Sequence, residues 1–414
     1  MQNATPMFRQ YLEIKKQYPG TLLFFRLGDF YELFGDDAVI GSRELEITLT
    51  ARHKDSPNPI PMCGVPHHAA ANYILRLVKK GYRVAICEQT EIAAKGIKLV
   101  KREVVRVITP GTAIDPQLLE SKESVYLASI CSAGETFGLA FLELSTGEFF
   151  TTEISGKNAW AKTCTDIESF APRELLFPES LQKLVENSFE SSLRPALPDA
   201  SNVVSISAPN SVKFSTTLTA LDDWLFHLED CRNILKIQLK VQELTAFGLS
   251  DKPEAVRAAG AVLRYAKDTQ KASAEHISEL HFFESTDFMI LDAVTLRNLE
   301  IVESKGESNK KTLLGVIDET VTGMGARLLR SWLLRPSIKR SEIQTRLSAV
   351  SELTDSMLRD KIRYLLKEVS DLERLVGRLN LGTATPRDLI ALNRSLSQTP
   401  NINSTLSDAQ SLLL

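Results

Sequence analysis

The hydrophobic periodicity of this 414-residue chain changes near residue 245, and this change constrains the fold more than any other feature of the sequence. Before it, short apolar runs with β-branched and aromatic residues alternate with helical patterns. After about residue 245, Ala, Val and Leu recur at helical spacing, as in LSDKPEAVRAAGAVLRYAKDTQ at 249–270. The sequence therefore predicts a multidomain chain of the α/β plus α class, with the mixed part first.

Helix and strand signals divide the first part of the chain. Thr5 and Pro6 form an N-cap and first-turn proline, and Pro19-Gly20 ends the helix that they begin. The same kinds of signal predict three further elements: a helix over about 68–80 and strands at 82–87 and about 99–108. Residues 1–115 are therefore predicted to form one mixed α/β domain.

A second sheet domain is predicted after a short polar segment. Residues 116–124 begin with Pro116 and are predicted to be a linker. Residues 125–131 and 138–150 then alternate or run apolar, with β-branched and aromatic residues typical of strands.

The helical part contains its own boundaries. A β-like FMILD at 288–292 interrupts it. Residues 363–381 are amphipathic, Gly382 ends this segment, and Pro386 begins another helix.

Residues 28–34, GDFYELF, place an aromatic ring and a carboxylate close together. Phe30 and Glu32 are two apart and lie on one side of an extended segment, directly after a Gly-Asp turn. A ring can insert between base steps of DNA. A carboxylate beside phosphates makes binding less favourable for a duplex that is too stiff to open. Because Phe30 is flanked by Tyr31 and other apolar residues, a buried core aromatic is the alternative interpretation.

Charge is segregated along the chain although the net charge is only −3. Residues 1–118 carry 16 Lys and Arg against 12 Asp and Glu, and the remainder carries 33 against 40. Within 95–106, KGIKLVKREVVR, there is one acidic residue, Glu103, and five basic ones: Lys95, Lys98, Lys101, Arg102 and Arg106. Such a stretch suits phosphate contact at a sheet edge, and a solvated strand face is the other interpretation.

Composition and termini exclude several classes of protein. The start, MQNATPMFRQ, lacks the layout of a signal peptide, and no apolar run approaches the roughly 18 residues needed to span a bilayer. A cytoplasmic protein without a membrane role is therefore expected. The five cysteines have neither CxxC nor Cys/His metal spacing, so reduced and mostly buried thiols are expected, without zinc or disulfides.

Several motifs are typical of one family when taken in order. The first part contains TLTARH at 48–53, PMCGVPHHAAANY at 61–73, VAICEQ at 84–89 and KREVVRVITPGT at 101–112. The rest contains GLAFLELSTGEFF at 138–150, VTLRNLE at 294–300 and DETVTGMGARLLRSWLLRP at 318–336. In this order and spacing the chain closely resembles the MutS family of DNA mismatch repair proteins.

The resemblance implies a domain for each part of the chain. It implies a mismatch-recognition domain at 1–115, the linker at 116–124, a ribonuclease H-like connector domain at 125–240, and the first part of a helical core, or lever, domain at 245–414. The family's clamp and carboxy-terminal ATPase are expected to be missing, because the sequence stops at Leu414 inside the lever.

No cofactor and no ATP hydrolysis are expected for this chain. The family's ATP and magnesium belong to the missing ATPase domain. The sequence contains no GxxxxGK[ST] loop, and the nearest match, GESNKKT at 306–312, lacks the second glycine and is interpreted as a solvated loop.

The resemblance also implies roles for four residues. Phe30 is expected to enter the minor groove and stack on a mispaired base while the duplex kinks, and Glu32 to hydrogen-bond a base edge. Arg52 and Lys54 are expected to contact the DNA backbone. The implied partners are double-stranded DNA with mismatches or small loops, a MutL-type protein and a further copy of the chain.

Two other functions stay open at this point. The chain is either a DNA binder or a MutS-like partner-binding protein without mismatch recognition of its own. A metal-dependent nuclease is the third possibility, because ribonuclease H-like folds elsewhere hold two divalent ions with carboxylates. Glu143, Glu148 and Glu153 are the available carboxylates, and they do not form an obvious complete cluster.

Overall fold

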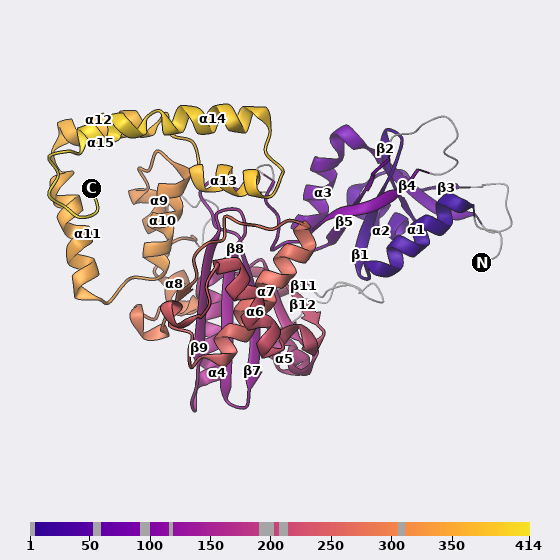
Figure 1. Ribbon diagram of the computed structural model, residues 1–414, viewed down its shortest axis with the longest axis horizontal. Coiled ribbons are helices and arrows are strands. Elements are labelled where there is room, and N and C mark those ends of the chain that lie inside the picture. Colours follow the sequence, from indigo (N-terminus) through magenta and orange to yellow (C-terminus); the bar gives the residue numbers. More distant parts are fainter. Residues whose placement is uncertain are drawn as a thin grey trace.

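Two mixed β-sheets and a final set of helices follow one another along the chain (Figure 1). The structure is a computed structural model that describes residues 5–52, 59–91, 100–115, 119–189, 203–206, 214–304 and 311–414. The predicted multidomain α/β plus α class is confirmed.

The first sheet has six strands in the order β3-β4-β2-β1-β5-β6. Its strands are β1 Thr21–Leu27, β2 Phe30–Phe34, β3 Thr50–Arg52, β4 Ile60–Pro66, β5 Arg83–Gln89 and β6 Arg102–Ile108. Its helices are α1 Pro6–Gln17, α2 Asp36–Leu45 and α3 Ala70–Lys79, with a 3₁₀ turn, η1, at His67–Ala69. Strand β1 is antiparallel to β2 and parallel to β5, so the sheet is mixed.

Both faces of this sheet are covered, which explains the apolar run in β1. Leu22 and Phe24 pack toward α2 and α3, whereas Leu23 and Phe25 pack toward α1, and all four side chains are buried. A strand buried on both sides loses the alternation of apolar and polar residues.

The predicted helix boundaries in this domain depend on local signals. The hydroxyl of Thr5 accepts a hydrogen bond from the Phe8 backbone N–H at 3.4 Å, which is the predicted N-cap of α1. The helix predicted over about 68–80 begins as the turn η1 and continues as α3, which ends at Lys79 before Gly81 in a left-handed conformation.

The second sheet has seven strands in the order β11-β12-β10-β7-β8-β9-β13. Its strands are β7 Tyr126–Ala133, β8 Thr136–Glu143, β9 Glu148–Ile154, β10 Glu174–Pro178, β11 Val203–Ile206, β12 Phe214–Leu221 and β13 His281–Phe282. Its helices are α4 Ala159–Phe170, α5 Gln182–Ser188, α6 Leu228–Leu239 and α7 Pro253–Gln270, and its 3₁₀ turns are η2 Glu179–Leu181, η3 Asp223–Phe226 and η4 Thr245–Phe247. Strands β7, β8 and β9 are antiparallel, whereas β10 is parallel to both β7 and β12.

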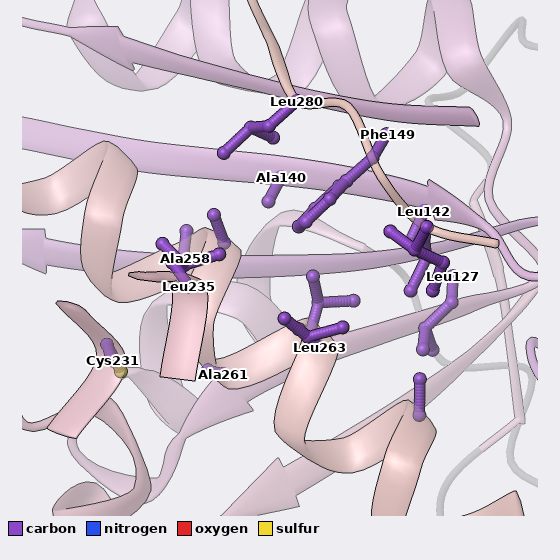
Figure 2. Close-up of a cluster of buried hydrophobic side chains, with 14 of the residues drawn as sticks. Leu127, Ala140, Leu142, Phe149, Cys231, Leu235, Ala258, Ala261, Leu263 and Leu280 are labelled. Atoms are coloured by element: carbon purple, nitrogen blue, oxygen red, sulfur yellow. The ribbon is translucent and has the colours of Figure 1, made fainter. Parts of the chain in front are cut away.

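Helices α6 and α7 pack on one face of this second sheet. Figure 2 shows Leu127, Ala140 and Leu142 of the strands in one cluster with Leu235 of α6 and Leu263 of α7, and all of them are buried. The helical spacing that begins near residue 245 therefore starts inside the core of the second sheet. The domain limits themselves stay a prediction.

Gly260 makes the close contact between α6 and α7 possible. A Cβ at this position would lie 2.3 Å from Cys231 Cβ and 2.5 Å from Cys231 Cα. We expect Gly260→Ala to destabilise the second domain by roughly 1–2 kcal/mol, since overpacking costs about 1–3 kcal/mol and Ala regains up to about 1 kcal/mol in a helix. Thermal unfolding measures this loss. Asp268→Ala, on the exposed face of the same helix, is the control, and an equal effect of the two variants would contradict the packing argument.

The final part of the chain is helical. Its helices are α8 Ala293–Asn298, α9 Leu313–Ile317, α10 Gly323–Leu334, α11 Arg340–Glu352, α12 Ser356–Leu366, α13 Leu372–Asn380, α14 Pro386–Leu396 and α15 Thr399–Thr405, preceded by a 3₁₀ turn, η5, at Ser285–Asp287. Figure 1 shows α12, α14 and α15 along the top of the molecule, in yellow.

Two details of this part differ from the prediction. The amphipathic segment 363–381 is divided between α12 and α13, because the Asp371 carboxylate accepts a hydrogen bond from the Arg374 N–H and starts a new helix. The β-like 288–292 contributes an isolated bridge between Phe288 and Ser337 and no strand.

The predicted stop at Gly382 and start at Pro386 are confirmed. The predicted solvated loop GESNKKT lies largely outside the described residues.

A buried carboxylate fixes the segment that leaves the first sheet. Glu174 of β10 is fully buried, and its carboxylate accepts hydrogen bonds from the Thr109 hydroxyl at 2.5 Å and the Gly111 N–H at 3.1 Å. The hydroxyls of Thr219 and Tyr265 also donate to it, at 2.8 and 2.7 Å. A buried carboxylate that accepts four hydrogen bonds holds this segment firmly against the second sheet.

Two arginines of the helical part fix the described part of the predicted linker, 119–124. Arg327 of α10 donates to the Ser121 carbonyl at 2.9 Å, and Arg374 of α13 donates to the carbonyls of Glu120 and Glu123 at 2.9 and 2.5 Å. These bonds attach the linker to the helices rather than leaving it free in solvent.

None of the helices in the described residues is long and apolar enough to span a membrane.

Candidate nucleic-acid interface

A two-residue hairpin presents Phe30 at one end of the first sheet. Leu27 pairs with Phe30, so Gly28 and Asp29 alone form the loop, and Gly28 has a φ of +57°. A positive φ at the first loop residue is the conformation for which such hairpins use glycine. Phe30 is 46% exposed, so the interpretation of this ring as a core aromatic is wrong.

Phe30, Glu32 and Phe34 share the face of β2 that is covered by α1. Only Phe34 packs under this helix: it is 1% exposed and its ring meets Tyr11 at a centroid distance of 4.9 Å. Phe30 and Glu32 lie further along the strand, beyond this cover. The structure thus brings the predicted ring and carboxylate together on one accessible patch.

Gly64 of β4 lies beside both side chains and adds no side chain of its own. It is the Cα partner of Glu32, and it is exposed. A Cβ at this position would lie 3.6 Å from Glu32 Cγ and 3.9 Å from Phe30 Cδ1. Gly64 is not among the residues predicted for the site, although a glycine inside the strand-like PMCGVP signals the close approach of another group.

Arg52 forms an ion pair with Glu32. Its Nη1 lies 3.3 Å from Glu32 Oε2, and its guanidinium carbon lies 5.8 Å from the centroid of the Phe34 ring. Burial raises the pKa of Glu32 above its ordinary value, and the positive charge of Arg52 offsets part of this rise. Lys54, the fourth predicted residue, lies outside the described residues.

The predicted basic edge is only partly a surface feature. Strand β6 is an edge strand of the first sheet, but its Arg102 is buried, which contradicts phosphate contact by this residue. The Arg102 Nε donates to the Arg26 carbonyl at 2.8 Å, and its guanidinium carbon lies 5.1 Å from the Phe25 ring centroid. Arg102 therefore stabilises the sheet.

The rest of this basic stretch gives a mixed result. Lys101 is exposed and forms an ion pair with Glu103 at 2.6 Å, and Arg106 is half-buried. Lys95 and Lys98 lie outside the described residues. Among the three of these basic residues that the structure describes, Lys101 is therefore exposed, Arg106 is half-buried and Arg102 is buried.

The carboxylates considered for a nuclease have structural partners. Glu143 accepts a hydrogen bond from the Thr146 N–H at 2.6 Å, Glu148 from the Tyr126 hydroxyl at 2.5 Å, and Glu153 from the first backbone N–H groups of α7, the nearer at 2.9 Å. In the part of the chain that the structure describes, no three His, Cys, Asp or Glu side chains are grouped so that they could hold a metal ion. These hydrogen bonds favour a role in the fold for all three.

Two sheet domains lead into a helical domain, and the first of them presents an exposed contact surface. The molecule is therefore a modular protein that exposes Phe30 beside the partly exposed Glu32 on its first sheet. Family models for MutS domains I, II and III match residues 5–117, 125–278 and 294–414, in that order. The chain belongs to the MutS family of DNA mismatch repair proteins.

Individual relatives agree with this assignment. The DNA mismatch repair protein MutS of Solibacter usitatus (strain Ellin6076) is 45% identical over 404 residues, which cover 96% of this chain and 44% of that protein. The MutS of Myxococcus xanthus (strain DK1622) is 44% identical over 414 residues, covering 100% of this chain and 44% of that protein. The MutS of Alkaliphilus oremlandii (strain OhILAs) is 41% identical over 416 residues, with coverages of 100% and 45%. The chain spans less than half the length of these curated relatives.

Proposed function

We propose that this chain binds mismatched double-stranded DNA and carries the mismatch-recognition part of a mismatch repair protein. Phe30 enters the minor groove and stacks on a mispaired base while the duplex kinks. The observation that carries this proposal is the exposure of Phe30 at a two-residue hairpin, beside Glu32. No enzymatic step is assigned to the chain.

Discrimination in this mechanism is thermodynamic. Unstacking a base step costs a few kcal/mol, and a mispair lowers that cost. Stacking of a base on an aromatic ring returns about 1–3 kcal/mol. A paired duplex therefore gains less than a mispaired one from the same insertion.

Glu32 adds a second, opposing interaction. Its carboxylate hydrogen-bonds a base edge that the mispair has freed, with a proton on either the base or the carboxyl group, and it repels the backbone of an intact duplex. The raised pKa of Glu32 supports a carboxyl group that takes up a proton more readily than usual.

Arg52 and Lys54 are proposed as backbone contacts, which set the register of the protein on the duplex without reading sequence. Arg52 is partly exposed at the end of strand β3 and forms an ion pair with Glu32. The family membership also supports a MutL-type protein and a further copy of the chain as partners.

Replacement of Glu32 by glutamine tests the repulsive role. We expect Glu32→Gln to raise affinity for a matched duplex about fivefold, because a charge removed near a phosphate is worth about 1 kcal/mol in water.

Because burial raises the pKa of Glu32, we also expect the mismatch affinity of the unsubstituted chain to increase as pH falls from 7 toward this raised pKa. Glu32→Gln has no carboxyl group to protonate, so this increase is expected to flatten. Fluorescence anisotropy between pH 5 and 8 measures both effects, and an unchanged matched affinity would contradict the repulsion.

The direct test compares matched and G·T-mismatched duplexes at several salt concentrations by fluorescence anisotropy. The proposal expects tighter binding to the mismatch and a linear loss of log affinity with log salt. Equal affinity for both duplexes, or no binding by a folded chain, would favour the partner-binding alternative.

A further inference from the structure

The ion pair between Arg52 and Glu32 joins strands that are not neighbours. Strand β4 lies between β3, which carries Arg52, and β2, which carries Glu32. Arg52 is the Cα partner of Ile60 on β4, whereas Glu32 is the partner of Gly64 on the same strand. The guanidinium therefore crosses β4 diagonally to reach Glu32 at 3.3 Å.

Two features of the sheet make this crossing possible. Gly64 has no side chain to fill the space beside Glu32, where its Cβ would otherwise lie 3.6 Å from Glu32 Cγ. The Phe34 ring lies under the path, with its centroid 5.8 Å from the guanidinium carbon, where a cation is attracted by the ring. The Arg52 guanidinium is thus positioned by both the Glu32 carboxylate and the Phe34 ring.

The pair also limits what the carboxylate can do. The side chain of Glu32 is 22% exposed and that of Arg52 is 36% exposed, so the carboxylate is partly removed from water. Because Arg52 holds one carboxylate oxygen, Oε2, the ion pair restricts the orientations of the carboxylate. Without Arg52, it would lose its ion-pair partner and rotate freely.

We propose that Arg52 determines specificity by positioning Glu32, so that the carboxylate is already oriented toward a base edge next to Phe30. This inference rests on the proposed function. A phosphate contact by Arg52 would act on matched and mismatched duplexes alike, whereas orientation of the Glu32 carboxylate matters only where a base edge is free. The role therefore changes the ratio of the two affinities, and a phosphate contact alone changes both affinities equally.

A double-mutant cycle tests this role with the full chain and the same two duplexes. Anisotropy gives the matched-to-mismatched Kd ratio for the unsubstituted chain, Arg52→Ala, Glu32→Ala and the double variant. We expect Arg52→Ala to reduce the ratio about two- to fivefold, the range for a partly exposed ion pair, and to leave it unchanged in the Glu32→Ala background. A reduction by the same factor in both backgrounds, or no reduction in either, would overturn the proposal.

Further measurements separate positioning from other roles. Arg52→Lys keeps the charge and is expected to restore the ratio only in part, since lysine lacks the planar fork. Gly64→Val leaves every charge in place and adds side-chain atoms against Glu32, so we expect it to disturb the carboxylate and reduce the ratio as well. An unchanged ratio in a folded Gly64→Val variant would count against the need for an oriented carboxylate. A phosphate contact alone would lower the salt slope by about 0.9 without changing the ratio. Failure of the proposed function has another signature, because the unsubstituted chain itself would then show no mismatch preference.

Discussion

Phe30→Ala is expected to abolish the preference of this chain for mismatched DNA. The variant removes a ring that is 46% exposed and contributes little to the core, so the fold is expected to be retained. Loss of base stacking is worth about 1–3 kcal/mol, which corresponds to an about 5- to 150-fold weaker affinity for the mismatched duplex. Affinity for the matched duplex is expected to change much less, because the ring does not insert there.

A matched control for this variant is Val39→Ala. Val39 is 44% exposed and belongs to α2, which packs on the opposite face of the first sheet. Anisotropy on matched and G·T duplexes is expected to show no change for this control. Phe30→Trp keeps a stacking surface and is expected to retain a preference. A mismatch preference that survives Phe30→Ala intact would show that Phe30 is not the inserted ring.

Arg327→Ala is expected to destabilise the junction between the linker and the helical part by about 3–5 kcal/mol. Arg327 is 6% exposed and its guanidinium donates to both carboxylate oxygens of Asp371, at 2.6 and 2.9 Å. It also donates to Glu373 at 2.5 Å and to the Ser121 carbonyl. Removing one partner of a buried pair costs this much when the remaining charge is left without compensation. Because Asp371 is 21% exposed and keeps Arg374 at 4.0 Å, we expect a loss toward the lower end of this range.

Hydrogen exchange of residues 119–124 and of α13 measures this local loss, because a multidomain chain opens in parts. Arg394→Ala is the control, since its ion pair with Glu368 is exposed and is expected to contribute at most about 1 kcal/mol. Equal protection factors in the two variants would contradict a structural role for the Arg327 cluster.

The same cluster predicts a dependence on pH. Burial alone would raise the pKa of Asp371, but the hydrogen bonds and charge of Arg327 outweigh it and hold this pKa below its usual value. An Asp with a lowered pKa stabilises the fold above its unfolded pKa, about 3.9, and this contribution is lost as pH falls through the folded value. We therefore expect the junction to open below about pH 4, and this acid sensitivity to be weaker in Arg327→Ala.

Local signals in the sequence predicted many element boundaries correctly. The Thr5 cap, the stop at Gly382 and the start at Pro386 each depend on backbone geometry that one or two residues determine. The division of 363–381 was missed because Asp371 has the position expected of a polar-face residue in one continuous amphipathic helix. Only the hydrogen bond from the Arg374 N–H shows that Asp371 begins a new helix.

Charge was harder to predict than periodicity. Arg102 belongs to a basic stretch, yet it is buried over the Phe25 ring and donates to the Arg26 carbonyl. A run of cations does not show which side chains point into a sheet, since alternate residues of an edge strand face opposite sides.

The sequence by itself determined the order of the domains, the family and the two-residue spacing that places Phe30 and Glu32 on one face of a strand. Only the tertiary structure decided that Phe30 is exposed, that Gly64 leaves space beside it and that Arg52 reaches Glu32 across β4. The physical reason is the range of the interactions. Periodicity and caps depend on neighbours within a few residues, whereas exposure and ion pairing depend on strand order, which brings residues 32, 52 and 64 together.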